Sequence, residues 1–295
     1  MEIRTLKYLQ ALAQEGNVSN AAKSLHITQP TLSRQLAALE DELGCELFTR
    51  TYKGMELNDQ GIMLLRYADS ILDLVGKAQD ELSVQSSNVT GTVHIGAGET
   101  MNMAYIAQAM ELTRSRFPGV SFQMHSGATL DLMDGFARGA YDFFVECEVR
   151  PHVDANVLEL PIKDRWGILV SRSSDLASRK SIRPKDLVGH SLIMPRQALG
   201  NGTLTRWAGD FIDEYDVLMD INLPLNGSLV ARSGAGAQLT YEGLVETSAD
   251  STLVFVPLSP KLTSTQGLVW RKTALSKQAT AFLDSLREVL AERSR

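Results

Sequence analysis

The apolar positions of the first 58 residues predict three helices followed by two short strands. Apolar residues recur every three or four positions in the helices, which places them on one face. A turn of three residues separates the second helix from the third, and a hairpin turn separates the strands. The expected segments are 2–15, 19–25, 29–43, 45–50 and 55–57. This order, a tight helix-turn-helix followed by a β-hairpin, predicts a winged helix-turn-helix.

Residues 59–87 predict one long helix, with Asn58 as its N-terminal cap. Its apolar positions alternate in steps of three and four, which is the spacing of a coiled-coil seam. The seam consists of Leu65, Ala68, Leu72, Val75, Gln79 and Leu82. We expect this helix to pair with a second copy of the chain, and the alternative is an ordinary helix of a domain core. The polar stretch 85–90 is typical of a linker.

From Gly91 onward, short apolar strands alternate with amphipathic helices. The expected strands are 92–97, 120–124, 142–145, 157–160, 166–170, 253–256 and 268–270. The expected helices are 103–116, 130–137, 204–215 and 279–290. This alternation is typical of an α/β domain with mostly parallel sheets. The predicted fold class is therefore an α/β domain preceded by an all-helical winged helix-turn-helix with a β-hairpin wing and a long linker helix.

The composition is that of a folded protein with a full-sized core, because 44% of the 295 residues are hydrophobic and 22% are charged. No apolar run reaches the roughly 18 residues of a membrane span, and the N-terminus lacks the apolar core of a signal peptide. We therefore expect a cytoplasmic protein without a membrane partner. Cys45 and Cys147 lie far apart and predict no disulfide framework. The net charge of −6 argues against a protein that coats nucleic acid without sequence preference.

The start of the third helix carries the side chains that a DNA-reading helix needs. In a helix-turn-helix, the N-terminal residues of the second helix of the motif reach base edges in the major groove. Here these residues are Gln29, Pro30, Thr31, Ser33 and Arg34. The Gln29 amide suits adenine, the Arg34 guanidinium suits guanine or a phosphate, and the two hydroxyls suit phosphates. Leu32 is expected to face the domain core instead.

Cations near this helix indicate contacts with the DNA backbone. Arg50 and Lys53 lie at or beside the hairpin tip, where a wing meets phosphates or the minor groove. Arg4 is placed to reach a phosphate from the first helix. The alternative for each is a solvated surface charge, and residues 1–58 are not basic overall. A helical module that docks another protein is therefore the competing hypothesis.

A series of residues in fixed order runs through the first 61 positions. It comprises Ala21-Ala22, Leu25, Gln29-Pro30, Ser33, Leu39-Glu40, Leu43-Gly44, Leu47-Phe48, Arg50 and Gly61. In this order and without gaps, the segment resembles the DNA-binding domain of the LysR-type transcriptional regulators. The resemblance implies a sequence-specific regulator that binds double-stranded promoter DNA as a homodimer or homotetramer. RNA polymerase is a further candidate partner.

The same resemblance implies how the chain is divided. Residues 1–58 form the DNA-binding domain, residues 59–90 the dimerisation helix and hinge, and residues 91–295 the effector-binding domain. That last domain is similar to periplasmic binding proteins, with a small-molecule cleft between two α/β lobes. Lobe one takes about 91–161 plus 267–295, and lobe two takes about 162–266.

By this resemblance, effector contacts fall at strand ends and helix N-termini that face the cleft. Four stretches qualify, at 98–101, 126–129, 194–203 and 227–236. The expected effector-binding residues are Thr100, Met101, Ser126, Thr129, Met194, Thr203 and Ser233. For each hydroxyl, the plainer interpretation is a helix cap. Neither a cofactor nor a metal is expected, and the identity of the effector is not implied.

Two carboxylates depart from the usual pattern of this family. Glu146 and Glu148 flank Cys147 after an expected strand, where the family more often carries apolar or small residues. Carboxylates near the cleft would disfavour a small anionic effector, but we expect both to point to solvent at the strand end. They also leave acid–base chemistry open. No metal-ligand spacing, dinucleotide fingerprint, Walker loop or nucleophile elbow accompanies them, so we expect no enzyme.

Overall fold

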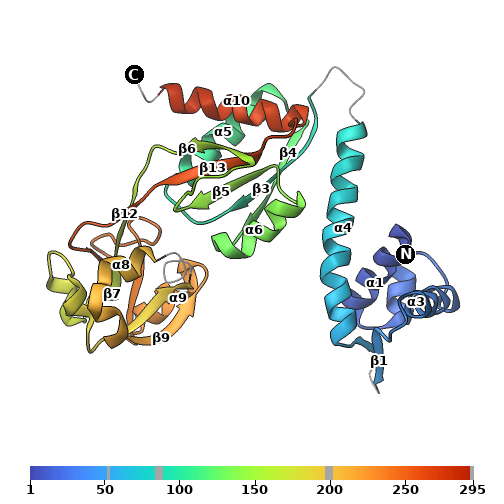
Figure 1. Ribbon diagram of the computed structural model, residues 1–295, viewed down its shortest axis with the longest axis horizontal. Coiled ribbons are helices and arrows are strands. Elements are labelled where there is room, and N and C mark those ends of the chain that lie inside the picture. Colours follow the sequence, from blue (N-terminus) through green and yellow to red (C-terminus); the bar gives the residue numbers. More distant parts are fainter. Residues whose placement is uncertain (52–53, 84–88, 197–201, 293–295) are drawn as a thin grey trace. The chain divides into compact units, whose positions relative to one another are not determined.

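The computed structural model describes residues 1–51, 54–83, 89–196 and 202–292. The chain folds into two compact units, Met1–Gln85 and Ser86–Arg295 (Figure 1). Most of the expected linker at 85–90 lies outside the described residues, as do Lys53 and the side chains of Gln79 and Leu82. Among the described helices, none combines the length and the apolar character that crossing a membrane requires.

The N-terminal unit is a winged helix-turn-helix followed by a long helix, in the predicted order. Its elements are α1 (Ile3–Glu15), α2 (Val18–Ser24), α3 (Gln29–Leu43), β1 (Phe48–Thr51), β2 (Gly54–Leu57) and α4 (Asp59–Ser83). The two strands pair antiparallel, with Phe48 opposite Leu57. Leucines spaced at three and four along α1 and α3, among them Leu9 and Leu36, meet in one buried core. The helical periodicity of the sequence is therefore confirmed here.

The turns of this unit follow from the residues at the helix ends. The Asn17 side chain accepts hydrogen bonds from the backbone N–H groups of Ser19 and Asn20, at 2.8 and 3.3 Å, and so caps α2. Gly16 and Gly44 follow α1 and α3 with φ of 61° and 67°. Glycine adopts this left-handed conformation without the steric cost that a side chain adds. These ends keep the three helices short and closely packed.

The predicted coiled-coil seam of α4 is wrong in its first half. Ala68 is fully buried, and Leu65 and Leu72 pack with it in the core that α4 shares with α1. The reason is that steps of three and four also describe one face of an ordinary amphipathic helix. Ile62 of α4 remains about half-exposed, and so do Met63, Tyr67 and Leu74. The last three share one face of the helix. Their spacing of four and seven places them on one separate stripe of the helix.

The C-terminal unit contains two sheets, of which the first has the strand order β4-β3-β5-β13-β6. Its strands are β3 (Gly91–Ala97), β4 (Val120–Ser126), β5 (Phe143–Cys147), β6 (Ala155–Glu159) and β13 (Gln266–Arg271). Strand β3 runs parallel to β4 and β5, whereas β13 runs antiparallel to β5 and β6. A strand from the last thirty residues therefore lies inside the sheet that begins at Gly91 and defines lobe one.

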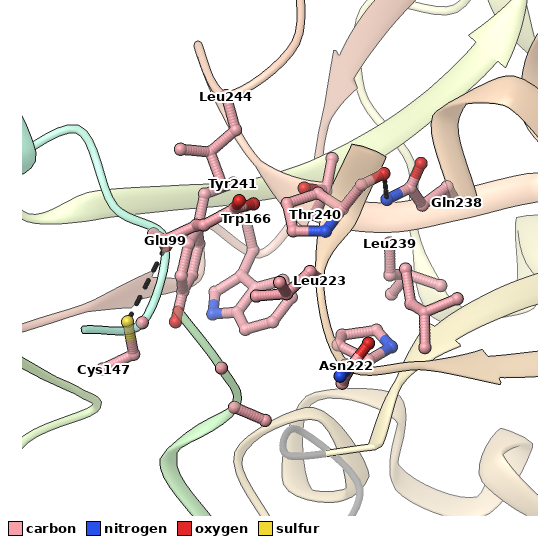
Figure 2. A pocket seen from close by; sticks show the side chains of 16 residues that line it. Glu99, Cys147, Trp166, Asn222, Leu223, Gln238, Leu239, Thr240, Tyr241 and Leu244 are labelled. Atoms are coloured by element: carbon pink, nitrogen blue, oxygen red, sulfur yellow. Dashed lines mark hydrogen bonds between the residues drawn. The ribbon is translucent and has the colours of Figure 1, made fainter. Parts of the chain in front are cut away.

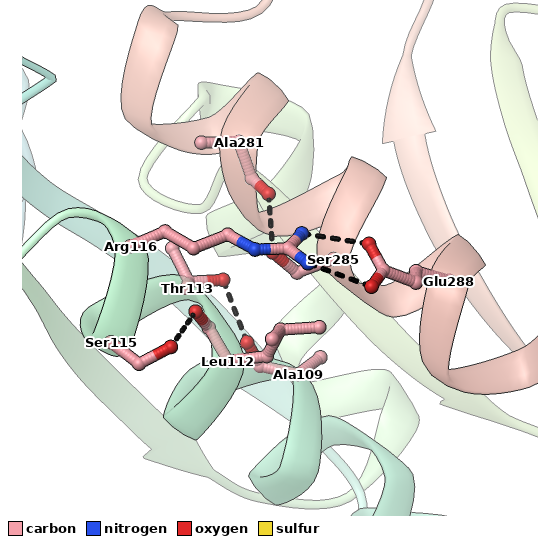
Figure 3. A network of polar contacts seen from close by, with 8 residues as sticks. All are labelled: Ala109, Leu112, Thr113, Ser115, Arg116, Ala281, Ser285 and Glu288. Atoms are coloured by element: carbon pink, nitrogen blue, oxygen red, sulfur yellow. Dashed lines mark hydrogen bonds and ion pairs between the residues drawn. The ribbon is translucent and has the colours of Figure 1, made fainter.

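Helices cover both faces of the lobe-one sheet. They are α5 (Met103–Arg116), α6 (Thr129–Arg138) and α10 (Lys277–Glu292). Helices α5 and α10 share a core with Val93 of β3, whereas α6 packs on Phe144, which points to the opposite face. Arg116 donates two hydrogen bonds of 2.7 Å to Glu288 across α5 and α10 (Figure 3). Since both side chains are exposed, the apolar contacts of these helices contribute more to stability than this ion pair.

The second sheet defines lobe two and has the strand order β11-β7-β10-β8-β9, with β12 paired to β7. Its strands are β7 (Asp164–Ser171), β8 (Ser191–Pro195), β9 (Asp216–Ile221), β10 (Ala237–Tyr241), β11 (Leu253–Pro257) and β12 (Thr263–Ser264). Its helical segments are η1 (Asp175–Ser178), η2 (Pro184–Leu187), α8 (Thr203–Ala208), η3 (Gly209–Glu214) and α9 (Pro224–Arg232).

Three expectations about the C-terminal unit need correction. Both sheets are mixed rather than mostly parallel, because β7 and β13 follow the crossings between lobes and pair antiparallel with their neighbours. The helix expected over 204–215 is α-helical only to Ala208, since Gly209 (φ 58°, ψ −137°) leaves the helical conformation before η3. Residues 227–228, expected at a helix end, lie inside α9.

Candidate nucleic-acid interface and effector cavity

The start of α3 presents polar side chains outward. Gln29, Pro30, Thr31 and Arg34 are exposed and Ser33 is half-buried, whereas Leu32 is fully buried. Thr28 is the N-cap, but its hydroxyl lies 2.8 Å from the hydroxyl of Thr31 instead of accepting from the helix backbone. The first turn of α3 therefore exposes polar side chains, whereas Leu32 packs into the core of the unit.

A network of backbone contacts fixes the base of the hairpin against α3 and α4. Glu40 Oε1 accepts hydrogen bonds from the N–H groups of Leu47 at 2.7 Å and Phe48 at 3.2 Å. Asn58 accepts from Gly61 N at 2.9 Å, as expected for the cap of α4. A Cβ at Gly61 would lie 2.2 Å from the carbonyl oxygen of Leu47, so only glycine fits there. These contacts hold the strands of the wing at one position relative to the third helix.

The expected backbone-contacting cations are distributed over this unit. Arg4 is exposed on α1. Arg50 belongs to β1, opposite Met55, and its side chain lies outside the described residues. Lys53 also lies outside them. The structure therefore places Arg4 on the surface and Arg50 in the hairpin.

A cavity of about 530 Å³, open mouth included, lies between the two lobes of the C-terminal unit (Figure 2). Lobe one contributes residues at or just after the ends of three of its strands, namely Gly98, Glu99, Gly127, Ala128 and Cys147. Lobe two contributes Trp166, Pro195, Ile221, Asn222, Leu223, Pro224, Gln238, Leu239, Thr240, Tyr241 and Leu244. Ligand sites in α/β folds occur at the carboxyl ends of strands, as here.

Aromatic side chains form one wall of this cavity. The rings of Trp166 and Tyr241 lie with centroids 4.4 Å apart and planes inclined by 58°. Trp166 Nε1 donates a 2.8 Å hydrogen bond to Ser264 Oγ in the segment that returns to lobe one. Because both its ring face and its N–H are engaged, Trp166 is held in one orientation.

Polar contacts join the two segments in which the chain passes between the lobes, one before β7 and one before β13. Asp164, at the start of β7, accepts hydrogen bonds from Thr100 Oγ1, from Gln266 Nε2 at 2.8 Å and from Met101 N at 3.3 Å. Burial raises the pKa of Asp164, although these hydrogen bonds act in the opposite direction. Asn102 pairs with the backbone of Ile162 through Nδ2 at 2.8 Å and Oδ1 at 2.9 Å. Lobe one is therefore anchored to both crossings at its edge beside the cavity.

Comparison with known protein families accounts for both units. Residues 3–62 match the family of bacterial regulatory helix-turn-helix proteins, lysR family, and residues 86–291 match the LysR substrate binding domain. The chain belongs to the LysR family. The resemblance noted in the sequence is therefore confirmed, as is the fold class of a winged helix-turn-helix followed by a two-lobed α/β domain.

A curated relative of this LysR-type chain is similar to it over part of its sequence. It is 30% identical over 195 residues to a hydrogen peroxide-inducible genes activator of Pectobacterium carotovorum subsp. carotovorum. That alignment covers 66% of this chain and 64% of the relative, so the chain spans less than two thirds of its length.

Two solved structures extend the comparison to the whole chain. CbnR, a LysR family transcriptional regulator, matches with a TM-score of 0.72 at 19% identity, over 98% of this chain and 99% of that chain. Full-length CbnR complexed with its target DNA matches with a TM-score of 0.69 at 20% identity, over 98% and 100% of the chains. At such identities these two structures show a shared fold and nothing finer.

None of the seven residues expected to bind the effector in this LysR-type chain is among the residues that line the cavity. Thr129 Oγ1 donates to Cys147 O at 3.4 Å, Met194 is buried in the core of lobe two, and Ser233 Oγ donates to Val230 O at 2.8 Å. Ser126 is exposed at the end of β4. Thr100 and Met101 contact Asp164, as described above. Thr203 donates to Glu148.

The expectation that Glu146 and Glu148 point to solvent is wrong. Glu146 is 1% exposed, and its carboxylate lies 2.7 Å from His152 Nε2. Glu148 has a φ of 60° after the end of β5, and it accepts hydrogen bonds from Ser264 Oγ at 2.8 Å and Thr203 Oγ1 at 3.1 Å. Burial raises the pKa of Glu148. Both carboxylates are therefore engaged by the protein itself.

The Cys147 thiol beside the cavity is held in its unreactive form. Cys147 is fully buried, and burial together with four surrounding carboxylates raises the pKa of its thiol far above the ordinary value. A thiol needs its thiolate form to react as a nucleophile or to bind metal. Among the described residues, no cluster of three histidine, cysteine or acidic side chains is arranged to hold a metal ion.

The lining residues of lobe two were missed at the sequence level. Most belong to β10 or to residues 222–224 at the start of α9, neither of which the periodicity identified. The only local signal is the run Ala237–Tyr241, AQLTY, after a glycine-rich stretch. Gln238 and Thr240 are polar although both are buried, so the sequence of this core strand resembles that of a loop.

Proposed function

We propose that this LysR-family chain is a transcriptional regulator that binds promoter DNA sequence-specifically through α3. The observation that carries the proposal is the exposed polar turn at Gln29–Arg34 above the buried Leu32. A helix with this arrangement enters the major groove, where Gln29 suits adenine and Arg34 suits guanine or a phosphate. Arg4, Arg50 and Lys53 are proposed to contact phosphates on either side.

The competing hypothesis is a protein-docking module, because residues 1–58 are not basic overall. Two observations favour DNA. The outward face at the start of α3 is polar rather than apolar, whereas the core of a protein-docking patch is depleted of charged side chains. CbnR, whose fold this chain shares, has been crystallised with its target DNA. We propose that the chain works in the cytoplasm, because a regulator of this kind acts on genomic DNA, and RNA polymerase is a further proposed partner.

We propose that the interlobe cavity is the effector site and that the chain is not an enzyme. The division proposed for the chain is 1–58 for DNA binding, 59–90 for pairing and 91–295 for the effector. Six of the seven expected residues are proposed to position the cavity walls, namely Thr100, Met101, Ser126, Thr129, Met194 and Thr203. Ser233 follows the C-terminal end of α9, whereas the lining residue Pro224 begins that helix. Thr100 and Thr203 support this role, since each donates to a carboxylate across the two lobes.

The effector need not be the one that a relative's name suggests. The Pectobacterium carotovorum relative is named for hydrogen peroxide, a reagent that oxidises thiolates. The sequence contains two cysteines, and the one in the effector unit, Cys147, has a pKa far above the ordinary value. This chemistry supports a non-covalent ligand in preference to peroxide acting at Cys147.

We propose that the chain assembles as a homodimer or homotetramer. The stripe Met63, Tyr67 and Leu74 on α4 supports a paired helix, because three large apolar side chains about half-exposed on one face favour burial. Two copies on one DNA site also match the two-fold repeats that helix-turn-helix dimers recognise.

The experiment that tests DNA binding is an electrophoretic shift on the DNA adjoining the gene's own start, at fixed salt. Arg34→Ala is expected to weaken specific binding by about 1–3 kcal/mol. Arg114→Ala removes an equal charge from the exposed surface of the other unit and serves as the control. Equal shifts for Arg34→Ala and the control would contradict the placement of α3 in the groove.

A further inference from the structure

Two acceptor groups in the interlobe cavity lack partners among the described residues. Gln238 is fully buried, and its Nε2 donates to Pro224 O at 3.0 Å while its Oε1 accepts nothing. The carboxylate of Glu99 is half-buried and makes no hydrogen bond or ion pair with any side chain or backbone group in the described part of the chain. Both side chains line the same cavity (Figure 2).

An unpartnered buried acceptor points to a donor that arrives with a ligand. Leaving a buried polar atom unsatisfied costs about 1–3 kcal/mol, and native proteins retain few such atoms. The Gln238 amide is fixed by its bond to Pro224, which leaves Oε1 as the free end. Desolvation is also the sole cause of the raised pKa of Glu99, which agrees with a carboxylate that no donor of the described chain neutralises.

The charge around the cavity selects against anions. None of the lining residues is a lysine, arginine or histidine. Four carboxylates, those of Glu99, Glu146, Glu148 and Asp164, act on the Cys147 thiol at the cavity wall. Arg165 beside Trp166 lies 3.8 Å from Glu242, and Arg196 beside Pro195 is paired with Asp220 at 2.7 Å. Arg232 lines a separate adjoining pocket that shares Glu99 and Leu244. A ligand with a positive charge is therefore attracted, whereas a carboxylate ligand is repelled.

The remaining wall requires a ligand with an apolar body. Trp166 and Tyr241 present aromatic surface, and Leu223, Leu239 and Leu244 present aliphatic surface. Aromatic faces also attract cations when water is excluded.

We propose that this cavity binds an organic ammonium compound with an apolar or aromatic body. The N–H groups of the ligand donate to Gln238 Oε1 and to the Glu99 carboxylate, and its body packs on Trp166 and Tyr241. This inference rests on the proposed role of the cavity as the effector site. It assigns Glu99 and Gln238 as the residues that determine the ligand class.

The test uses three probes that share one body and differ in the head group. Calorimetric titration of the full chain with 2-phenylethylamine, 2-phenylethanol and 3-phenylpropanoate compares a cation, a neutral donor and an anion. We expect the amine to bind at least about tenfold tighter than the alcohol, and the carboxylate to bind weakest. Leu244→Trp fills the cavity and should abolish the heat of amine binding.

Matched variants test whether the two acceptors, Glu99 and Gln238, cause the tighter binding of the amine. Glu99→Gln keeps the shape of the side chain and should remove the preference for the amine while sparing the alcohol. Gln238→Met removes the acceptor at similar volume and should weaken amine and alcohol alike. Glu214→Gln, an exposed carboxylate elsewhere in lobe two, is the control and should change nothing.

Three results would overturn the proposal: no binding of any probe, tightest binding of the carboxylate, or a preference for the amine that survives Glu99→Gln. Each preparation is also tested for promoter binding by electrophoretic shift. Retained DNA binding with a failed probe series means that the ligand class is wrong and the regulator proposal stands. If the unmodified chain does not bind promoter DNA, the regulator proposal is refuted whatever the calorimetry shows.

Discussion

Thr203 at the start of α8 donates its hydroxyl to Glu148 at the end of β5, over 3.1 Å, and so joins lobe two to lobe one. The same carboxylate accepts from Ser264 at 2.8 Å in the segment that returns between the lobes. Glu148, which departs from the usual family pattern, therefore contacts both lobe two and the connecting segment before β13. The relative position of the lobes depends on contacts of this kind beside the cavity.

Thr203→Val is expected to loosen this interlobe contact without affecting DNA recognition. The hydrogen bond to a charged acceptor contributes about 1.5–3 kcal/mol, and Glu148 retains its bond to Ser264. We expect wild-type promoter affinity in an electrophoretic shift but a reduced induction ratio in a reporter assay. Thr205→Val, two positions later in α8 and exposed, is the control. An unchanged induction ratio would show that the contact has no part in the response.

Glu40→Ala is expected to destabilise the N-terminal unit by about 1.5–3 kcal/mol, because the N–H groups of Leu47 and Phe48 lose a charged acceptor. Chemical denaturation followed by circular dichroism measures this change. Asp41→Ala, the exposed neighbour on the same helix, should alter the free energy of unfolding by less than about 0.5 kcal/mol. Equal effects of the two substitutions would mean that the wing is held by its apolar contacts alone.

Gly61→Ala tests the close approach of α4 to the wing. The added Cβ would lie 2.2 Å from a backbone oxygen, which cannot rotate away as a side chain can. We expect a loss of about 1–3 kcal/mol in stability and a weaker electrophoretic shift. Gly76→Ala on the same helix meets nothing within 4 Å and should be neutral or slightly stabilising.

Leu74→Glu is expected to convert the assembly to monomers, since it places a charge in the proposed apolar stripe of α4. Sedimentation velocity measures the mass in solution. Gln60→Glu adds the same charge at an exposed position on the same helix and should leave the mass unchanged. A Leu74→Glu protein of wild-type mass would assign the pairing to another surface.

Cys147 is expected to resist alkylation in the folded chain, because its thiol is fully buried and has a strongly raised pKa. Iodoacetamide labelling followed by mass spectrometry measures the modification of each cysteine. Cys45 is partly exposed and is the internal control. Peroxide should leave promoter binding unchanged, and rapid oxidation of Cys147 would refute the proposal of a non-covalent effector.

The stability of the effector unit should decrease as pH rises through the titration of Asp164. Burial raises the pKa of Asp164, so the folded chain holds the proton more readily than the unfolded chain. The stabilisation is therefore complete below the unfolded pKa of about 3.9 and is lost as pH rises through the folded pKa.

Asp164→Asn stays neutral at every pH and isolates this effect. Denaturation at about pH 4.5 and about pH 7.5 should show the wild type losing stability relative to the variant as pH rises. Asp250→Asn, an exposed carboxylate of the same unit, should show no such trend. A trend of opposite sign would mean that the hydrogen bonds from Thr100 and Gln266 outweigh burial.

The parts of the structure that sequence predicts well are those with local causes. The helix expected over 103–116 has these bounds in the structure, because its apolar spacing and the Pro118 that follows mark both ends. The exposed turn at Gln29–Arg34 follows likewise from a leucine stripe that fixes which face is buried. In each case the deciding interactions lie within a few residues.

The parts that sequence did not predict depend on contacts between distant segments. The Gln238 side chain is buried because α9 packs over β10, and no local pattern reveals this. Glu148 is engaged by residues 55 and 116 positions away. Local periodicity also cannot decide which stripe of α4 packs on α1, since Ala68 and Tyr67 both fit a helical repeat.

The place of β13 between β5 and β6 has a consequence for how the chain folds during synthesis. Lobe two is built from one continuous stretch and can close as soon as that stretch leaves the ribosome. Lobe one must wait with an open edge until residues 266–292 emerge, because they supply its inner strand and the helix that covers Val93. Translation therefore completes the inserted lobe before the lobe into which it is inserted.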